Sequence, residues 1–552
     1  MLGDRKFDLE AKARAGCLPS LHLARPDSVG MKGHIMVRRR WCLVLAVVAA
    51  VGVMGTGCAS SGDSPGTDRE VDTSATLRAG WTQGITSLDP HMATSEVASF
   101  LFGLNSIYDR LFTINSAGEV EGMLVDSWEY STDGRQLSLQ LREDATFRDG
   151  TQLGAQVVKV NLDRARTLDS PVVKRSMAPV TEVQANGPYE VTLHLVSPTN
   201  LMPYQLAGMS GFIMHPDLIA NGDPGTETNG SGAYSVESWA PGEKLVLVRD
   251  RDDYWDKDAA QVARIEHTAI ADFQAYTNAV AGGQIDIGQF QPGTIASVEG
   301  RRGLNTVPVP MGIGTELMLN RDIGPLTDVR VRQALNYAID REAITEALYP
   351  GSDARWQYSR DGLPAFDSGL EGRYAYDPAK AKALLAEAGY PVGIDLGEVI
   401  ISNATTPGVA DVLKEQFGQA GIRFEPQVLD GIEGITTFAG GGSPAYLNFT
   451  SYGLGFAGGM VTRSGATQNP AGTTPDYDQL FADATDTRRS AEEREASAVE
   501  LNDYLVEEAW GVPMTWVTYP WVMSDRVGNF SADTDYATTW GPYDFRYLTI
   551  SG

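Results

Sequence analysis

The stretch NGSGAYSVESWAPGEKLVLVRDRDDYW, residues 229–255, decides the fold of this 552-residue chain. Residues 233–239 are predicted to form a short strand. A turn is predicted at 240–243, Ala-Pro-Gly-Glu, because proline presets φ and glycine accepts positive φ. Residues 245–248 are an apolar run of the length of a buried strand. The stretch therefore predicts a β-hairpin that is followed by an acidic segment and the aromatic pair Tyr-Trp.

Alternating and helical patterns continue on both sides of this hairpin, which indicates a mixed α/β protein. Strands are predicted at 77–81, 122–129, 137–142, 190–195 and 513–519. Helices are predicted at 95–111, 157–165, 272–281, 327–342, 377–388 and 492–510. A loop is predicted for 459–474.

The composition indicates an acidic globular protein. Hydrophobic residues make up 42% and charged residues 21% of the chain, which is enough apolar material for sizeable cores. The first 57 residues hold nine Lys or Arg and four Asp or Glu, so the remainder has 35 basic and 67 acidic residues and a charge of −32. A body this acidic would repel a phosphate backbone, and nucleic-acid binding is therefore not expected. The acidity indicates solubility, with a cationic ligand as the alternative.

The N-terminal region has the form of an export signal. Three arginines, residues 38–40, precede the apolar run 41–55, and small residues lead to Cys58. The run is shorter than the roughly 20 apolar residues of a membrane span. A cysteine after small residues resembles a bacterial lipobox, although Gly55 stands where leucine is usual. We therefore expect residues 1–57 to be a signal peptide. Residues 1–35 lack the form of such a peptide, so the alternative is that 1–35 is a mis-assigned start and that translation begins at Met31 or Met36.

Behind Cys58, the residues up to 75 are rich in Gly, Ser, Asp, Thr and Pro and are predicted to be a flexible tether. The other cysteines, Cys17 and Cys42, precede it, so the body has no disulfide framework and no cysteine metal site.

A search for catalytic motifs gives no candidate. The sequence contains no Walker A motif, and no G-x-S-x-G match lies in a predicted strand-turn-helix context. Residues 453–458 fit G-x-G-x-x-G, but no helical pattern is predicted after them, so a glycine-rich loop is the better interpretation. The body's four histidines, His91, His194, His215 and His267, are widely spaced. We therefore predict no enzyme activity, no catalytic residue, no metal site and no cofactor.

Several motifs in order resemble family 5 of the solute-binding proteins of ABC importers, the peptide/nickel type. The hairpin stretch matches G-(S/T)-G-x-Y, W-x-P-G-E and D-Y-W, with Ala233 where proline is commoner. The other matching strings are GMLVDSWE (122–129), FRDGT (147–151), GQIDI (283–287), TDVRVRQALNYAIDRE (327–342) and YDPAKAKALLAEAG (376–389). The resemblance covers about residues 77–550.

The resemblance implies an α/β, two-lobed periplasmic-binding-protein-like fold with an extra subdomain and lobes joined by hinge strands. Lobe I would comprise 76–320 and 520–552, with an inserted subdomain near 95–225. Lobe II would span 325–515. The two lobes would close over a ligand by hinge motion.

Ligand-binding residues are expected by position relative to the family's segments. They are Ile85, Tyr108, Met311, Gly312, Tyr452 and Trp521. Peptide-binding relatives often carry W-x-x-D-Y-x-D-P near Tyr452, where an aspartate can meet a peptide's free ammonium. This chain has SYGLGFAGG there (451–459), which argues against recognition of a free peptide N-terminus.

The implied function is capture of a small solute, an oligopeptide or similar, and its delivery to ABC permease subunits. The chain would be a monomer, anchored by lipidated Cys58 to the outer face of the cytoplasmic membrane. The alternatives are a surface sensor or scaffold lipoprotein and an exported hydrolase with paired carboxylates. Oligosaccharides, opines and metal chelates are alternative ligands.

Overall fold

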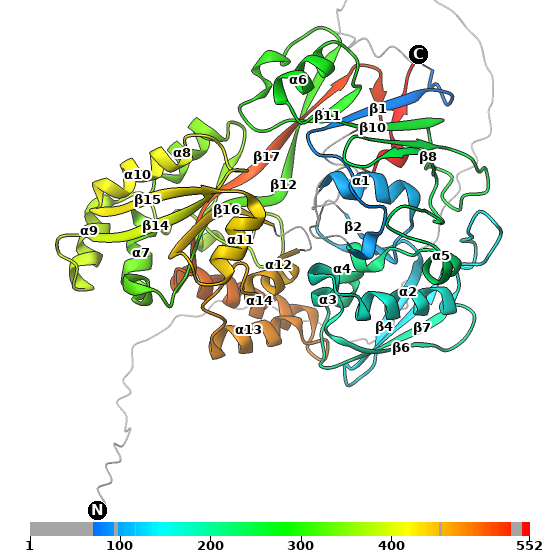
Figure 1. The fold of residues 1–552 in the computed structure, drawn as a ribbon. Helices are drawn as coiled ribbons and strands as arrows, with labels where there is room; N and C mark the ends of the chain where they lie inside the picture. Colours follow the sequence, from blue (N-terminus) through cyan, green and yellow to red (C-terminus); the bar gives the residue numbers. More distant parts are fainter. Residues whose placement is uncertain (1–69, 93–97, 116, 452–454, 531–543) are drawn as a thin grey trace, which may run out of the picture. The chain divides into compact units, whose positions relative to one another are not determined.

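The predicted hairpin is present in the computed structural model, which describes residues 70–552 except 93–97, 116, 452–454 and 531–543 (Figure 1). Its strands are β8 (Ser235–Ala240) and β9 (Lys244–Val248), which pair antiparallel with Trp239 opposite Leu245. Gly242 in the turn has φ +76°, a conformation that glycine adopts without steric cost. The hairpin belongs to a compact unit formed by residues 68–552.

The hairpin lies at one edge of an 11-stranded mixed sheet. The order along the sheet is β15, β14, β16, β12, β17, β11, β1, β10, β9 and β8, and β13 pairs with β17. The bounds of its other strands are β1 (Thr76–Trp81), β10 (Arg264–Ala269), β11 (Ile287–Gln289), β12 (Leu304–Leu319), β13 (Asp353–Ala354), β14 (Ile394–Ser402), β15 (Ile422–Leu429), β16 (Ala445–Ser451) and β17 (Gly511–Ser524).

Two long strands connect the two ends of this sheet. β12 has 16 residues and β17 has 14, and they pair antiparallel from Leu304 opposite Ser524 to Met318 opposite Gly511 (Figure 1). β17 also pairs with β11 near its C-terminal end, whereas β12 pairs with β16 near its own. The chain therefore passes from one half of the sheet to the other along β12 and β17.

A separate four-stranded antiparallel sheet has the order β4, β5, β7, β6. Its strands are β4 (Val125–Tyr130), β5 (Gln136–Leu141), β6 (Val180–Ala185) and β7 (Glu190–Leu195). Leu137, Leu139 and Leu141 are buried, as the alternation in β5 predicts. Two small ribbons complete the strands: β2 (Phe112–Ile114) with β3 (Val120–Gly122), and β18 (Val527–Gly528) with β19 (Thr549–Ile550).

The helices begin where the sequence provides caps. Asp328, Asp340 and Asp377 each accept a backbone N–H of the following helix, and Ser490 forms a capping box with Glu493. The α-helices are α1 (Ala98–Ile107), α2 (Ala155–Thr167), α3 (Pro171–Met177), α4 (Met202–Leu206), α5 (Pro216–Asn221), α6 (Phe273–Ala281), α7 (Val329–Tyr337), α8 (Arg341–Leu348), α9 (Pro378–Glu387), α10 (Val409–Gln419), α11 (Gly431–Ala439), α12 (Gly455–Ser464), α13 (Pro475–Thr485) and α14 (Ala491–Glu507). The 3-10 helices are η1 (Pro90–Met92), η2 (Met209–Gly211), η3 (Ile295–Ser297), η4 (Gly324–Thr327), η5 (Ser368–Leu370) and η6 (Phe545–Tyr547).

Two sequence predictions about helices are wrong. The helix predicted for 327–342 is two helices, because Asp340 caps α8 and the Arg341 side chain donates back to the carbonyl oxygen of Asn336 (2.9 Å). The loop predicted for 459–474 contains the C-terminal half of α12, which begins at Gly455.

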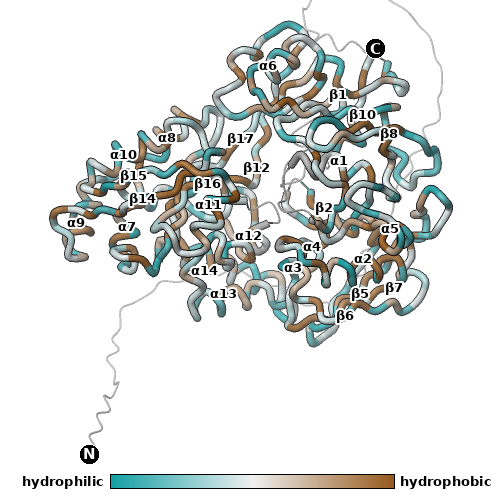
Figure 2. Tube along the Cα trace, viewed as in Figure 1, coloured by the Kyte–Doolittle hydropathy of each residue, from teal (hydrophilic) through white to brown (hydrophobic). Residues whose placement is uncertain are grey.

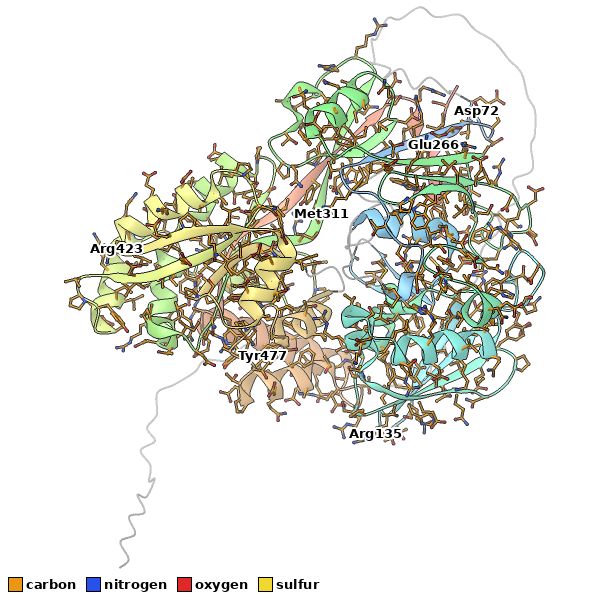
Figure 3. The ribbon with its side chains drawn as sticks, in the orientation of Figure 1. Asp72, Arg135, Glu266, Met311, Arg423 and Tyr477 are labelled. Atoms are coloured by element: carbon orange, nitrogen blue, oxygen red, sulfur yellow. The ribbon has the colours of Figure 1, made fainter. Side chains whose placement is uncertain are left out.

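The apolar side chains form one large core and smaller satellites. The large core includes the strands of both sheets, and Figure 2 shows hydrophobic segments along them. A second core lies under α13 and α14 and includes Tyr477, Leu501, Leu505 and Trp510. Figure 3 shows the side chains, with Met311 on β12 and Tyr477 on α13 labelled. Within the described residues, no helix is both long and apolar enough to cross a membrane.

Candidate functional site

The β12–β17 crossover is irregular where ligand contact is predicted. The regular register between the two strands is lost between Pro310 and Gly314, so Met311 and Gly312 lie outside the ladder with β17. Such an irregularity bends a strand and re-aims its side chains. Both residues are buried, and Met311 is only 3% exposed. The structure thus places two predicted site residues at the first of two register shifts between β12 and β17, the second lying between Thr315 and Glu316.

A buried ionic cluster lies directly beside this irregularity. Glu316 on β12 accepts hydrogen bonds from Arg463 on α12 and from Arg355, whose Nη2 lies 3.4 Å from Oε2. The side chains of Glu316, Arg355 and Arg463 are 0%, 0% and 1% exposed. Arg355 also donates to the Thr450 hydroxyl at 2.8 Å. Because burying a charge without a partner is costly, this cluster ties β12, β16 and α12 together.

Aromatic rings and a glycine surround the cluster. The Arg355 guanidinium carbon lies 4.3 Å from the ring centre of Trp516 on β17, and that of Arg463 lies 4.3 Å from Tyr358. A Cβ atom on Gly314 would lie 2.8 Å from Arg355 Nη1 and 2.6 Å from the Thr515 carbonyl oxygen. Glycine is therefore what allows the guanidinium to approach β12. This crossover contains the kinds of groups that bind polar solutes, namely charged forks and aromatic faces.

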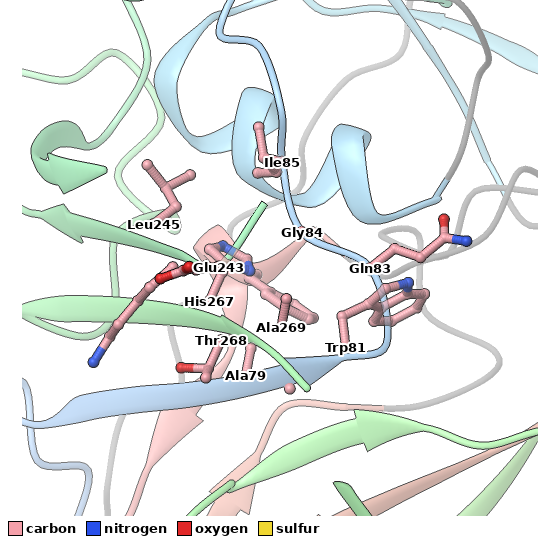
Figure 4. A pocket seen from close by; sticks show the side chains of 13 residues that line it. Ala79, Trp81, Gln83, Gly84, Ile85, Glu243, Leu245, His267, Thr268 and Ala269 are labelled. Atoms are coloured by element: carbon pink, nitrogen blue, oxygen red, sulfur yellow. The ribbon is translucent and has the colours of Figure 1, made fainter. Parts of the chain in front are cut away.

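Ile85 lines a second feature, a small cavity (Figure 4), and Trp521 contacts Trp81, which also lines it. Its lining includes Trp81, Ile85, His267 and Phe545. Its volume is about 20 Å³, room for about one water molecule, so it holds no solute of peptide size in this conformation. Trp521 is 0% exposed and its ring centre is 5.8 Å from that of Trp81. The structure therefore brings Ile85 and Trp521 together around Trp81, which the sequence did not single out.

Ile85 also has a clear structural task. Its carbonyl oxygen accepts from the Trp239 indole at 3.1 Å and from the Gly242 N–H at 2.8 Å. These bonds hold the β8–β9 hairpin to the segment after β1.

Tyr108 lies apart from both features. It is 0% exposed and its ring meets that of Phe212 edge-on at 6.4 Å. Its hydroxyl has no hydrogen-bond partner among the described residues. Burial, with the nearby Asp89 carboxylate, raises the pKa of this phenol. Tyr452, the remaining predicted residue, lies outside the described residues.

The side chains of residues 229–255, the hairpin stretch, are engaged in bonds that hold the scaffold. The Asp109 carboxylate, 0% exposed, accepts from Tyr254 at 2.6 Å, Ser231 at 2.8 Å and the Trp255 indole at 3.3 Å. Arg148 of the FRDGT string donates to the carbonyl oxygens of Gly230 and Gly232 at 2.9 and 3.0 Å. The family-like motifs thus bond to one another and hold the hairpin.

Sequence reasoning missed the ionic cluster. Glu316, Arg355 and Arg463 are distant in sequence, and none stands in a motif that was singled out. The one available signal was an apolar strand, residues 304–319, that carries a single carboxylate within its buried end. Among the described residues, no group of three His, Cys, Asp or Glu side chains could hold a metal ion.

Comparison with known proteins identifies the family. Residues 119–452 match the family described as bacterial extracellular solute-binding proteins, family 5 middle. The chain is 26% identical to the glutathione-binding protein GsiB of Pectobacterium atrosepticum over 402 residues, 71% of this chain and 74% of that protein. It is also 26% identical to GsiB of Salmonella paratyphi A over 350 residues, 62% and 68% of the two chains. The protein belongs to family 5 of the bacterial extracellular solute-binding proteins.

Solved structures show the same fold. The periplasmic binding protein DppA of Helicobacter pylori, in complex with the peptide STSA, matches with a TM-score of 0.74 at 18% identity, over 87% of this chain and 99% of that one. NikA of Staphylococcus aureus, in complex with Ni(L-His)2, matches with a TM-score of 0.71 at 21% identity, over 86% and 100%. The predicted periplasmic-binding-protein-like fold is therefore confirmed.

Family membership also confirms the predicted class of function. The family consists of solute-binding proteins of ABC importers, not enzymes, and it is extracytoplasmic.

Proposed function

We propose that this protein captures a small, peptide-like solute at the β12–β17 crossover and presents it to the permease subunits of an ABC importer. The observation that carries the proposal is the match to glutathione-binding relatives, which extends over 62% to 71% of the chain. Glutathione is a tripeptide with carboxylate and amide groups. The predicted residues Met311 and Gly312 lie at this crossover, beside the ionic cluster of Glu316, Arg355 and Arg463.

In this proposal, the solute lies between two lobes. Lobe I comprises 76–320 and 520–552 with an inserted subdomain near 95–225, and lobe II spans 325–515. β17 runs from the lobe II range into the lobe I range, and β12, near the end of lobe I, pairs with β16 of lobe II. Hinge motion in β12 and β17 would open and close the site. Met311 and Gly312 lie at the strand irregularity, and Ile85 and Trp521 adjoin Trp81. Tyr108 and Tyr452 complete the proposed ligand-binding set. Because the described members are buried, opening is required for a solute to reach them.

The protein would act at the cell envelope as a monomer. Lipidation of Cys58 and the tether up to residue 75 would anchor the body to the outer face of the cytoplasmic membrane. Metabolic labelling with an alkyne fatty acid tests this anchor: the wild type should be labelled and Cys58→Ser should not. Equal labelling of both would refute the assignment.

Two measurements test the solute class. Native mass spectrometry of the chain purified from its producing cells should show a retained small molecule. Calorimetric titration should then rank reduced glutathione and other tri- and tetrapeptides above oligosaccharides and nickel chelates. Tight binding of a sugar or a chelate, with no response to any peptide, would overturn the peptide-like assignment while leaving the family membership intact.

A further inference from the structure

Among the described residues, the inserted segments contact the α13–α14 pair at two facing turns. On one side are Gly134, in the β4–β5 turn, and the loop 198–200 after β7. On the other is the turn 485–487 between α13 and α14. The Asn200 N–H donates to the Thr485 carbonyl oxygen at 2.8 Å. A Cβ atom on Gly134 would lie 2.5 Å from the Thr487 hydroxyl oxygen and 2.7 Å from Pro198 Cβ. We call this contact, formed by Gly134 and 198–200 against 485–487, the latch.

The two sides of the latch belong to different cores. The strands β4–β7 bury residues such as Leu139 and Leu193 in the large core. The helices α13 and α14 bury Ala484 and Leu501 in the second core. At the latch, β4–β7 therefore meet α13–α14 through one backbone hydrogen bond and a few small side chains, and α4 and α12 make a further contact between the two regions.

Polar atoms at and beside the latch are buried without a hydrogen-bond partner among the described residues. They are Asn200 Oδ1, Thr487 Oγ1, the Tyr130 hydroxyl at the end of β4, and Arg494 Nε on α14. Tyr130 and Arg494 are close enough for the Arg494 charge to offset part of the rise that burial causes in the pKa of Tyr130. A polar group that is buried without a hydrogen-bond partner loses its hydration without compensation, which is unfavourable. Water can reach these atoms when the two sides separate, so closure of the latch is opposed by their desolvation.

We propose that the latch sets the free energy of closure, and that the unsatisfied Thr487 hydroxyl biases the solute-free protein toward the open state. The proposal rests on the proposed function, in which closure follows solute capture. A bias toward the open state lowers the apparent affinity for solute, because the apparent dissociation constant equals the intrinsic one divided by the fraction of protein in the binding-competent state. It also keeps the empty protein distinct from the loaded one. Thr487 and Gly134 then determine affinity without touching solute.

Two substitutions should move the equilibrium in opposite directions. Thr487→Val keeps the shape of the side chain and removes the hydroxyl, so the closed-to-open ratio should rise at least threefold. Gly134→Ala puts a methyl group into the Thr487 contact, so the ratio should fall at least threefold. Gly150→Ala is the matched control: Gly150 (φ +85°) and Gly134 (φ +70°) are both left-handed, but a Cβ on Gly150 meets nothing within 4 Å. It should leave the ratio unchanged.

The readout is single-molecule energy transfer between dyes on Lys174→Cys and Glu425→Cys, in full-length chain with Cys17, Cys42 and Cys58 replaced by serine. These two side chains are 64% and 77% exposed, on α3 and β15. Distributions are recorded without solute and with reduced glutathione. If the distributions of energy-transfer efficiency without solute are identical for all three variants and the parent, the proposed role of the latch is wrong. If glutathione shifts none of the distributions, the solute assignment fails, but the solute-free ratios still decide the role of the latch.

Discussion

Replacing Glu316 by glutamine is the sharpest test of how the crossover is held. The carboxylate is 0% exposed and accepts from two guanidinium groups, those of Arg355 and Arg463, which are themselves 0% and 1% exposed. Glutamine keeps the size of the side chain but removes the negative charge, leaving two buried cations without this counter-ion. Breaking a buried ion pair from one side costs about 3–5 kcal/mol, so we expect the free energy of unfolding to fall by about that amount.

The measurement is urea unfolding of the wild type and Glu316→Gln, followed by circular dichroism, with Glu425→Gln as the control. Glu425, on β15 of the same sheet, pairs with Lys414 on α10 at 2.9 Å, but the two side chains are 77% and 39% exposed. An exposed pair contributes about 0–1 kcal/mol, so the control should change little. A loss for Glu316→Gln no larger than that of the control would refute the view that the cluster holds β12 to α12.

Three further outcomes are expected. Burial, aided by the nearby Asp367 and Glu507, raises the pKa of Asp503 from 3.8 to about 6, so folding stability should fall as pH rises from about 4 through 6. Asp503→Asn should remove that fall, so the variant should be more stable than the wild type at pH 7.5 but not at pH 4. An equal difference in melting temperature between the two proteins at both pH values would contradict this. Gly314→Ala should cost about 1–3 kcal/mol by overpacking against Arg355, whereas Gly187→Ala, where a Cβ meets nothing within 4 Å, should not, as thermal melts will show. Tyr452→Ala should weaken binding of the retained solute by about 1–3 kcal/mol in calorimetry, and an unchanged dissociation constant would remove Tyr452 from the site.

Local patterns predicted the regular elements well. The alternation in residues 190–195 is β7, and the proline-glycine turn at 240–243 separates β8 from β9. The helices predicted to begin at 272, 327 and 377 are α6, α7 and α9, which start directly after the N-caps Asp272, Asp328 and Asp377. These features depend on interactions within a few residues, which a single sequence displays directly.

Long-range contacts account for the failures. α12 contains three glycines, which disfavour a helix by about 1 kcal/mol each, so its sequence indicates a loop. In the fold, its Arg463 bonds to Glu316, 147 residues away in sequence. The break between α7 and α8 is similar, because Arg341 also donates to the Pro513 carbonyl oxygen at 2.7 Å, which fixes the start of α8 against β17. Neither contact is visible in a local pattern.

The family-like motifs likewise reveal the scaffold but not the solute. The hairpin string is bonded to other parts of the fold: Asp109 accepts hydrogen bonds from Tyr254 and Trp255, and Arg148 of the FRDGT string donates to the carbonyl oxygens of Gly230 and Gly232. Their side chains are used in holding the hairpin, so they constrain the scaffold and carry little information about the solute. The groups beside the strand irregularity, Arg355 and Trp516 among them, come from segments with no shared signature. If the solute binds at the crossover, as proposed, its chemistry is therefore to be sought there and not in the motifs that reveal the fold.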